Sequence, residues 1–233
     1  MHRFVKQSLL GLLACVPAGF AAAADSSHPT VIELYESQGC SSCPPANANL
    51  NAIADRPDVL ALNFAVTYWD RLGWKDTFAQ QAFTDRQYEY AGARGDNSVF
   101  TPQMIVNGTG VLVGNRPEDV TDAITHYDRG SNGPQIDWST SKVTVSQTAP
   151  AQDVSVWLVR YDPRDLEVAI RRGENSGRTL PHRNIVKELV LLGAMSGDTA
   201  SFDLPKPSDP ELRTAVLVQQ GAGGPILGAA RMP

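Results

Sequence analysis

Apolar runs of strand length alternate with helical segments through the first half of the chain. Residues 31–35 (VIELY) form a short apolar run, and residues 59–66 (VLALNFAV) form a nearly continuous one, which is typical of a strand covered on both faces. Residues 103–114 predict two strands joined at Asn107-Gly108, because this dipeptide readily adopts the backbone angles of a tight hairpin turn.

Three helices are expected among these strands. They cover residues 46–56, about 77–94, and 117–128, with Pro or Gly at their boundaries. The resulting order β-α-β-α-β-β-α predicts a mixed α/β fold, in which helices cover both faces of one sheet. The first two strands should run parallel, because a right-handed crossover through a helix connects them.

The pattern changes after residues 129–134 (RGSNGP), which predict a domain boundary. Seven short, mostly β-type segments follow, separated by Gly, Pro, Asp and Ser. They are residues 142–145, 154–161, 166–170, 185–192, 201–204, 214–220 and 226–230. This spacing predicts an antiparallel, sandwich-like extension, so we expect an α/β domain over residues 25–130 and a β-rich domain over residues 134–233.

Residues 1–24 have the layout of a secretory signal peptide. Arg3 and Lys6 precede a mostly apolar run, and an Ala-x-Ala pattern ends at Ala24. A membrane anchor fits less well because the run is short, and a lipoprotein box at Cys15 fits less well because the run continues past it. We therefore expect a periplasmic or secreted protein with no membrane span in its mature chain.

Composition and charge narrow the classes of function. The 233 residues are 42% apolar and 19% charged, as in ordinary globular proteins. Twenty Lys and Arg residues against 25 Asp and Glu residues give a net charge of −5, which argues against nucleic acid as a partner. Removing the signal peptide takes away one of three cysteines and leaves Cys40 and Cys43 in a compartment where disulfides persist.

The two remaining cysteines form a C-x-x-C motif between the first strand and the first helix. A helix N-terminus favours a thiolate, which is the attacking species in disulfide exchange. We expect Cys40, as the more exposed cysteine, to attack a substrate and form a mixed disulfide that Cys43 resolves. No organic cofactor is then needed, because the Cys40–Cys43 disulfide is itself the redox group.

Other roles for the motif compete with this interpretation. Haem attachment needs a His directly after the second cysteine, where this chain has Pro44. Zinc needs two more ligands, and His28, His126 and His182 lack ligand spacing. Copper handling by the two thiolates, and an inert structural disulfide, stay open as alternatives. The inert disulfide is the more serious of these two alternatives, although the little entropic stabilisation that so short a loop gains weakens it.

Thr101-Pro102, directly before the third strand, completes a pattern that resembles the thioredoxin superfamily. The resemblance implies a thioredoxin-like domain over residues 25–130, with Pro102 in the cis form and Thr101 beside the cysteines to bind an extended substrate. It also implies that Glu33 is a buried proton acceptor for the resolving thiol, although a solvent-facing Glu33 fits the spacing equally well.

The loop after the second strand (TYWDRLGWKD) should converge on the same place. Loops that follow parallel strands lie at the carboxyl edge of the sheet, and the strand that starts at Pro102 begins at that edge. Tyr68, Trp69 and Trp74 are therefore expected to line a groove for substrate, unless the tryptophans only pack the loop onto the following helix. The expected partners are extracytoplasmic protein thiols or a redox partner protein.

Four segments extend the resemblance over nearly the whole mature chain. They are YESQGCSSCPPA, NFAVTYWDRLGWKD, FTPQMIVNG and GENSGRTLPHRNIV. With them the sequence resembles a bacterial exported family classed as domain of unknown function 1223, which implies a thioredoxin-like domain with a β-rich extension and no established substrate. Typical thioredoxins have an aromatic residue before the first cysteine, where this chain has Gly39.

A polar cluster in the extension predicts either an anion or partner site or a solvated turn between strands. Its members are Arg171, Arg172, Glu174, Asn175, Arg178, His182 and Arg183. We do not expect His182 to be catalytic. The leading hypothesis is an exported thiol–disulfide oxidoreductase that acts through Cys40 and Cys43, and the rival is a non-catalytic binding module with a structural disulfide.

Overall fold

The computed structural model describes residues 23–147 and 152–233, and the predicted signal peptide lies almost entirely outside them.

The helices are α1 (Cys43–Ile53), η1 (Asp70–Leu72, a 3-10 helix), α2 (Gln81–Arg94) and α3 (Pro117–His126). The strands of the first half are β1 (Thr30–Glu36), β2 (Val59–Ala65), β3 (Gln103–Val106) and β4 (Gly110–Leu112). The later strands are β5 (Gln135–Trp138), β6 (Lys142–Ser146), β7 (Val154–Asp162), β8 (Leu166–Ala169), β9 (Thr179–His182), β10 (Ile185–Ala194), β11 (Thr199–Asp203), β12 (Arg213–Gln220) and β13 (Ile226–Arg231). No helix within this part of the chain is long and apolar enough to cross a membrane.

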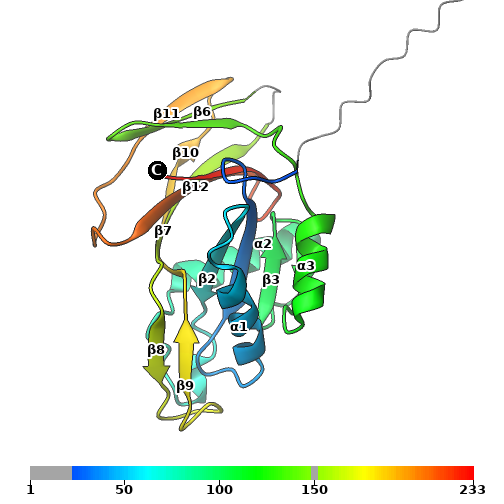
Figure 1. Ribbon diagram of the computed structural model, residues 1–233, viewed down its shortest axis with the longest axis vertical. Coiled ribbons are helices and arrows are strands. Elements are labelled where there is room, and N and C mark those ends of the chain that lie inside the picture. The colour runs from blue at the N-terminus through cyan, green and yellow to red at the C-terminus, as the bar shows by residue number, and fades with distance from the viewer. Residues whose placement is uncertain (1–22, 148–151) are drawn as a thin grey trace, which may run out of the picture.

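One mixed sheet of eight strands runs through the molecule in the order β13-β12-β7-β10-β2-β1-β3-β4 (Figure 1). β1 lies parallel to β2 and antiparallel to β3, and β3 and β4 form a hairpin. The hairpin turns at Asn107 and Gly108, whose φ angles of 48° and 74° lie in the left-handed region that Asn and Gly adopt most readily. The expected α/β fold and the expected turn are confirmed.

Helices cover both faces of this sheet, as the sequence predicts. On one face, Leu50 of α1 and Ile124 of α3 pack against Leu34 of β1. On the other face, Tyr90 of α2 packs against Tyr35 of β1, with ring centroids 6.3 Å apart. Because successive strand side chains point to opposite faces, every residue of β1 belongs either to the α1 face or to the α2 face.

The strands of the extension continue the same sheet. β7 pairs antiparallel with β10 and β12, and β12 pairs with β13. The two halves of the sheet meet between β10 and β2, where Ile185 is paired with Asn63 and the Asn63 N–H donates to the Asn184 carbonyl at 2.9 Å. Residues on both sides of the predicted boundary at 129–134 therefore contribute to one hydrogen-bonded sheet.

A second antiparallel sheet, β11-β6-β5, covers one face of the extension. Val143 and Val145 of β6 pack with Val156 and Leu158 of β7 and with Val216 of β12. The two layers enclose an apolar core between them, which agrees with the sandwich-like extension expected from the sequence.

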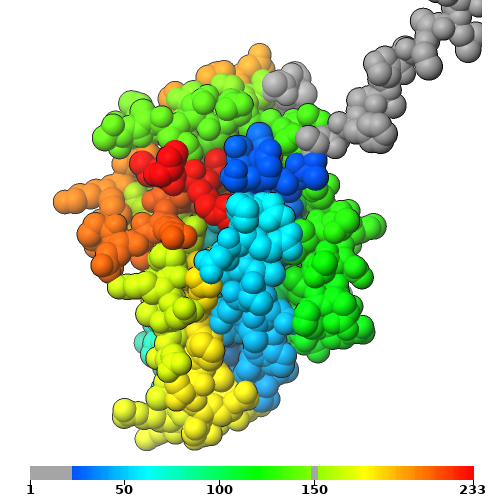
Figure 2. Space-filling view, viewed as in Figure 1, coloured from blue at the N-terminus to red at the C-terminus, as the bar shows by residue number. Residues whose placement is uncertain are grey.

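β8 and β9 form a separate hairpin that projects beside α1 (Figures 1 and 2). Asn47 of α1 donates to the Pro181 carbonyl of β9 at 2.6 Å, which fixes the hairpin against the helix. All seven predicted β-type segments occur as strands, but β5 and β9 were not expected. β9 (TLPH) contains a proline and is too short to show the alternation of a strand.

α2 begins at Gln81, four residues later than expected. The Phe78 N–H donates to the Asp76 carboxylate at 2.8 Å instead of joining the helix. The Phe78 ring packs edge-on against His182 of β9, with ring centroids 5.7 Å apart. Contacts with a distant hairpin therefore hold this segment outside the helix.

Candidate functional site

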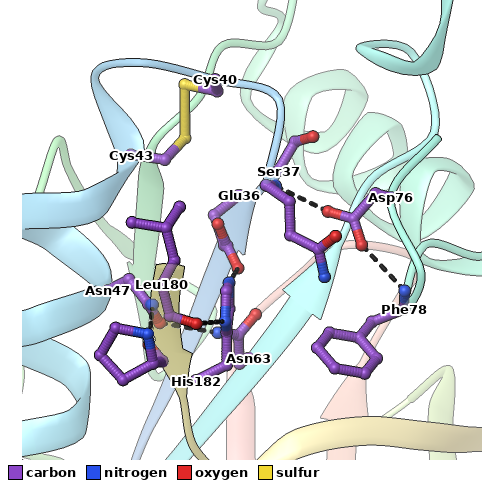
Figure 3. Close-up of polar contacts among 12 residues, drawn as sticks. Glu36, Ser37, Cys40, Cys43, Asn47, Asn63, Asp76, Phe78, Leu180 and His182 are labelled. Atoms are coloured by element: carbon purple, nitrogen blue, oxygen red, sulfur yellow. Dashed lines mark hydrogen bonds and ion pairs between the residues drawn. A yellow bond between two sulfur atoms is a disulfide. The ribbon is translucent and has the colours of Figure 1, made fainter. Parts of the chain in front are cut away.

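Cys40 and Cys43 form a disulfide just beyond the carboxyl end of β1 (Figure 3). Their Cα atoms are 5.4 Å apart, and Cys43 is the first residue of α1. Pro44 lies in the first turn of the helix, where its missing N–H removes no helical hydrogen bond. The Cys43 N–H donates to the Cys40 carbonyl at 3.2 Å, so the motif forms a closed turn at the helix start.

The Thr101–Pro102 peptide bond is cis, as the resemblance implied. Thr101 Oγ1 donates to Cys40 Sγ at 3.3 Å and accepts a hydrogen bond from Trp69 Nε1 at 2.7 Å. Ser42 Oγ lies 3.2 Å from the same sulfur. The three segments that were expected to converge at this edge of the sheet do so.

The aromatic side chains of the 67–76 loop make hydrogen bonds within the site. Trp74 Nε1 donates to Gln38 Oε1 at 3.0 Å, and the Tyr68 hydroxyl donates to Gln87 Oε1 at 3.2 Å. Burial raises the pKa of Tyr68 to about 12. These aromatics and Trp69 are half-buried. They fix the loops around the disulfide, and their contact with a substrate stays a prediction.

Both cysteines are buried, and this corrects the expectation that Cys40 is the more exposed. Cys40 is 0% exposed and Cys43 is 1% exposed. The loop between β8 and β9, residues 170–178, hydrogen-bonds to residues 38–41 of the cysteine loop from 133 to 137 residues further along the chain. No local pattern in the sequence indicates a contact over this separation.

Two neighbouring residues of that loop bind the backbone of the motif. Asn175 Nδ2 donates to the carbonyls of Gln38 and Cys40 at 2.9 Å and 2.8 Å. Glu174 Oε2 accepts hydrogen bonds from the N–H and the hydroxyl of Ser41 at 3.0 Å and 2.7 Å. These bonds from Ser41 lower the pKa of Glu174.

Other members of the predicted polar cluster also make contacts inside the protein. Arg178 Nη1 donates to Asn175 Oδ1 at 2.8 Å. Arg183 is ion-paired with Asp55 at 2.8 Å and with Asp165 at 3.0 Å. The cluster thus fixes the hairpin in place, and its use as an anion site stays a prediction.

Glu33 is fully buried, but it lies on the α2 face of β1. Its carboxylate accepts two hydrogen bonds from Arg86, at 2.8 Å and 2.9 Å, and one each from the hydroxyls of Tyr35 and Tyr90, at 2.6 Å and 2.9 Å. Arg86 also donates to Gln219 of β12 at 3.0 Å, so the network ties α2 to the extension. The structure therefore does not bring Glu33 together with the resolving thiol, because its carboxylate is held by a permanent cation on the face away from α1.

A second buried carboxylate, Glu36, lies on the α1 face of β1, below the disulfide in Figure 3. Glu36 Oε1 is 3.3 Å from Nε2 of His182, which the end of β9 places there. His182 Nδ1 faces the Leu180 carbonyl at 3.0 Å. Nearby, Asp76 accepts a hydrogen bond from the Gln38 N–H at 2.7 Å. Glu36, Asp76 and His182 are together called the acid–base cluster.

Two groups of the acid–base cluster have raised pKa values. Burial alone lowers the pKa of His182, but the nearby charges of Glu36 and Asp76 outweigh burial and raise it. Burial and, after it, the charge of Glu36 together raise the pKa of Asp76 to about 6. The chain thus places proton-exchanging groups near neutral pH directly behind the cysteine loop.

The sequence assigned no acid–base role to any member of the acid–base cluster. It placed His182 in a polar cluster, either an anion or partner site or a solvated turn, and gave Glu36 and Asp76 no role. Glu36 could have been found from strand parity, because it shares the face of Leu34, on which α1 packs, whereas Glu33 does not. His182 carries no comparable signal, because only the folded hairpin brings it under the motif.

A groove of about 390 Å³ lies beside the disulfide, between the start of α1 and β9. It is lined by Pro44, Pro45, Asn47, Ala48, Arg178, Thr179, Leu180 and Pro181. Among residues 23–147 and 152–233, no three His, Cys, Asp or Glu side chains are grouped so as to hold a metal ion. His182 Nε2 faces Glu36, and copper handling by the two thiolates stays a prediction.

Comparisons with solved structures show where similar folds occur. A crystal structure of an Agrobacterium tumefaciens protein from a structural genomics programme is similar with a TM-score of 0.71 and 29% identity, covering 90% of this chain and 94% of that one. HBP35 of Porphyromonas gingivalis is similar in fold alone, with a TM-score of 0.60 and 11% identity, covering 90% of this chain and 76% of that one. No curated protein matches significantly.

The profile of one protein family covers most of the chain. Its match spans residues 31–219, so it includes the C-x-x-C motif, Thr101-Pro102 and the 170–178 loop. The chain belongs to the family described as "Protein of unknown function (DUF1223)".

Proposed function

We propose that this protein is an extracytoplasmic thiol–disulfide oxidoreductase, with a thioredoxin-like domain over residues 25–130. The strand order β2-β1-β3-β4, with α1 and α3 on one face and α2 on the other, supports this domain. The observation that carries the proposal is the contact between Cys40 Sγ and Thr101, the residue before the cis-proline. It joins the only cysteines of the predicted mature chain to the segment expected to bind substrate.

The reaction exchanges one disulfide for another. In the reduced pair, the Cys40 thiolate attacks a substrate disulfide, forms a mixed disulfide, and releases the other substrate sulfur as a thiolate that takes up a proton. The Cys43 thiolate then attacks Cys40 Sγ, so that the Cys40–Cys43 bond forms and the second substrate thiolate leaves and is protonated. The substrate gains two electrons and two protons, and the reverse sequence oxidises a substrate dithiol.

Hydroxyl groups around Cys40 favour its thiolate. Thr101 Oγ1 donates to the sulfur, and Trp69 Nε1 donates to Thr101 in turn, which fixes the hydroxyl in a donating orientation. Hydrogen bonds to the charged form stabilise that form and lower a thiol pKa. Cys40 is therefore the attacking cysteine in this proposal.

The acid–base cluster takes the role that the sequence had suggested for Glu33. Glu36 lies on the face of β1 that carries Cys43 and α1, and its partner His182 titrates rather than holding a fixed charge. A buried carboxylate with a titratable partner can accept the thiol proton of Cys43 when that residue becomes the attacking thiolate. We propose that Glu36 is this acceptor and that His182 and Asp76 position it.

A trapped intermediate tests the proposed exchange. The Cys43→Ala variant, incubated with insulin as a disulfide-containing polypeptide, should form a mixed disulfide through Cys40 that non-reducing electrophoresis and mass spectrometry detect. The Cys40→Ala/Cys43→Ala variant is the matched control and should form none. The wild-type pair should have a reduction potential above about −300 mV against glutathione, because structural disulfides lie below that value.

The burial of both cysteines favours one rival, a binding module in which the disulfide is structural. In that case Cys43→Ala captures no insulin, and the potential lies below about −300 mV. Together these two results would replace the oxidoreductase with the binding module.

A further inference from the structure

The loop of residues 170–178 binds the chain around the redox pair although it belongs to the β-rich extension. Its own shape is held internally, for example by the Gly177 N–H, which donates to the Ile170 carbonyl at 2.8 Å. Within the part of the chain that the structure describes, all its hydrogen bonds to the rest of the protein come from Glu174 and Asn175. Figure 2 shows the yellow hairpin pressed against the blue segment that contains α1.

The two residues bind three positions in and just before the motif. Asn175 is 0% exposed and holds the carbonyls of Gln38 and Cys40, on either side of the turn into the motif. Glu174 holds Ser41, which lies between the cysteines. An attacking thiolate must reach a sulfur directly, and both cysteines are buried while these bonds are made.

We propose that Glu174 and Asn175 are the specificity-determining residues of this site. By holding the 170–178 loop closed over the oxidised pair, they exclude small thiols and admit a partner that first displaces the loop. For its meaning in the cell this inference rests on the proposed function, because it concerns which partners exchange with Cys40. The closed loop itself is a property of the disulfide and is measurable with a small reductant.

The rate of reduction of the oxidised protein by excess dithiothreitol tests the inference, followed by thiol alkylation and mass spectrometry. We expect Asn175→Ala to be reduced about tenfold faster than wild type, because two hydrogen bonds that close the loop are lost. Glu174→Ala should be reduced about threefold faster, because its bonds are exposed to water. The matched controls Asn132→Ala and Glu167→Ala, on exposed side chains away from the motif, should stay within about twofold of wild type.

If the loop only controls access to the disulfide, opening it changes the rate of reduction and leaves the redox equilibrium unchanged. The equilibrium constant between the protein and dithiothreitol should therefore move less than about twofold in Asn175→Ala and Glu174→Ala. Rates that match wild type would overturn the inference. An equilibrium constant that moves by the same factor as the rate would also overturn it, because the loop would then stabilise the disulfide rather than control access.

Two further points keep the test decisive. Because Asn175 is buried, Asn175→Ala counts only if its urea transition shows a folded protein, and Glu174→Ala supplies the result otherwise.

The outcome of the reduction experiment is separate from that of the insulin trap. Faster reduction of the variants without insulin capture would support control of access by the loop and reject the oxidoreductase. Insulin capture with unchanged reduction rates would support the oxidoreductase and reject control of access by the loop.

Discussion

β1 carries two buried glutamates on opposite faces, and their surroundings differ in kind. Glu33 is bound by Arg86, a permanent cation, and by two tyrosine hydroxyls. Glu36 is bound by His182, a cation only when protonated, and lies near Asp76. The cation of the first network is permanent, whereas the second contains His182, whose pKa is raised, and Asp76, whose pKa is raised to about 6.

The difference separates a structural carboxylate from one suited to proton transfer. In the Glu33 network, burial chiefly raises the pKa of Tyr35 and Tyr90 well above the ordinary value, so neither tyrosine exchanges a proton near neutral pH. The acid–base cluster raises the pKa of Asp76 to about 6 instead. Two buried carboxylates can therefore differ in the kind of cation beside them, and the proposed proton acceptor is the one beside a titratable histidine.

The largest expected effect comes from breaking the Glu33 network. Arg86→Met leaves Glu33 as an unpaired charge in the core, and we expect the free energy of unfolding to fall by about 3–5 kcal/mol in urea titrations. Arg116→Met removes exposed ion pairs with Glu118 and Asp119 and is the matched control, with a much smaller loss of stability. Equal losses in the two variants would show that the Glu33 network is not a stabilising one.

The next effect distinguishes the two glutamates by function. Glu36→Gln should slow the oxidation of the reduced protein by oxidised glutathione about a hundredfold at pH 7, because the proposed proton acceptor is lost. Glu33→Gln, three residues away on the other face, should lower the free energy of unfolding and leave this rate within about threefold of wild type. Rapid quenching followed by mass spectrometry measures both rates. A Glu36→Gln rate equal to that of wild type would remove Glu36 from proton transfer.

The smallest effect is a pH dependence of stability. The folded-state pKa of Asp76 is raised from 3.8 to about 6, and that of His182 is raised above 6.5. The folded protein thus holds more protons than the unfolded chain, first between pH 3.8 and about 6 through Asp76, and then above pH 6.5 through His182. Their contribution to stability is complete at the acidic end of each range and decreases as the pH rises.

Asp76→Asn isolates the acidic part of this dependence. Between pH 4 and pH 6, the free energy of unfolding should fall by about 2 kcal/mol less in Asp76→Asn than in wild type. Asp122→Asn, an exposed substitution in α3, should keep the wild-type dependence. Urea titrations at several pH values measure it, and an unchanged slope in Asp76→Asn would contradict a raised pKa for Asp76.

Local patterns account for most of the fold. The order of the first four strands, the helices on both faces and the turn at Asn107 follow from apolar periodicity and turn chemistry. β9 could not be predicted, because a four-residue segment with a proline has no periodicity to show. The continuous sheet was also beyond prediction, since it depends on β10 meeting β2 at a single paired residue, Ile185 with Asn63.

The residues of the site, like the strands of the fold, include some that the sequence could predict and some that it could not. Cys40, Cys43, Thr101 and Pro102 could be predicted, because each belongs to a short motif at a known place in the topology. Glu174, Asn175, Asp76 and His182 could not, because their partners lie 38 or more residues away and only tertiary packing brings them together. Glu33 was expected in place of Glu36 because spacing to Cys40 was considered without the alternation of faces along β1.

The distance along the chain between the 170–178 loop and the cysteines has a consequence for biogenesis. A polypeptide leaves the ribosome or a translocation channel from its N-terminus, so Cys40 and Cys43 emerge long before Glu174 and Asn175. Until about three quarters of the chain has emerged, the pair is as accessible to oxidants as any thiols of a nascent chain. The disulfide can thus be installed early by general catalysts, and it is covered only when the hairpin folds onto α1.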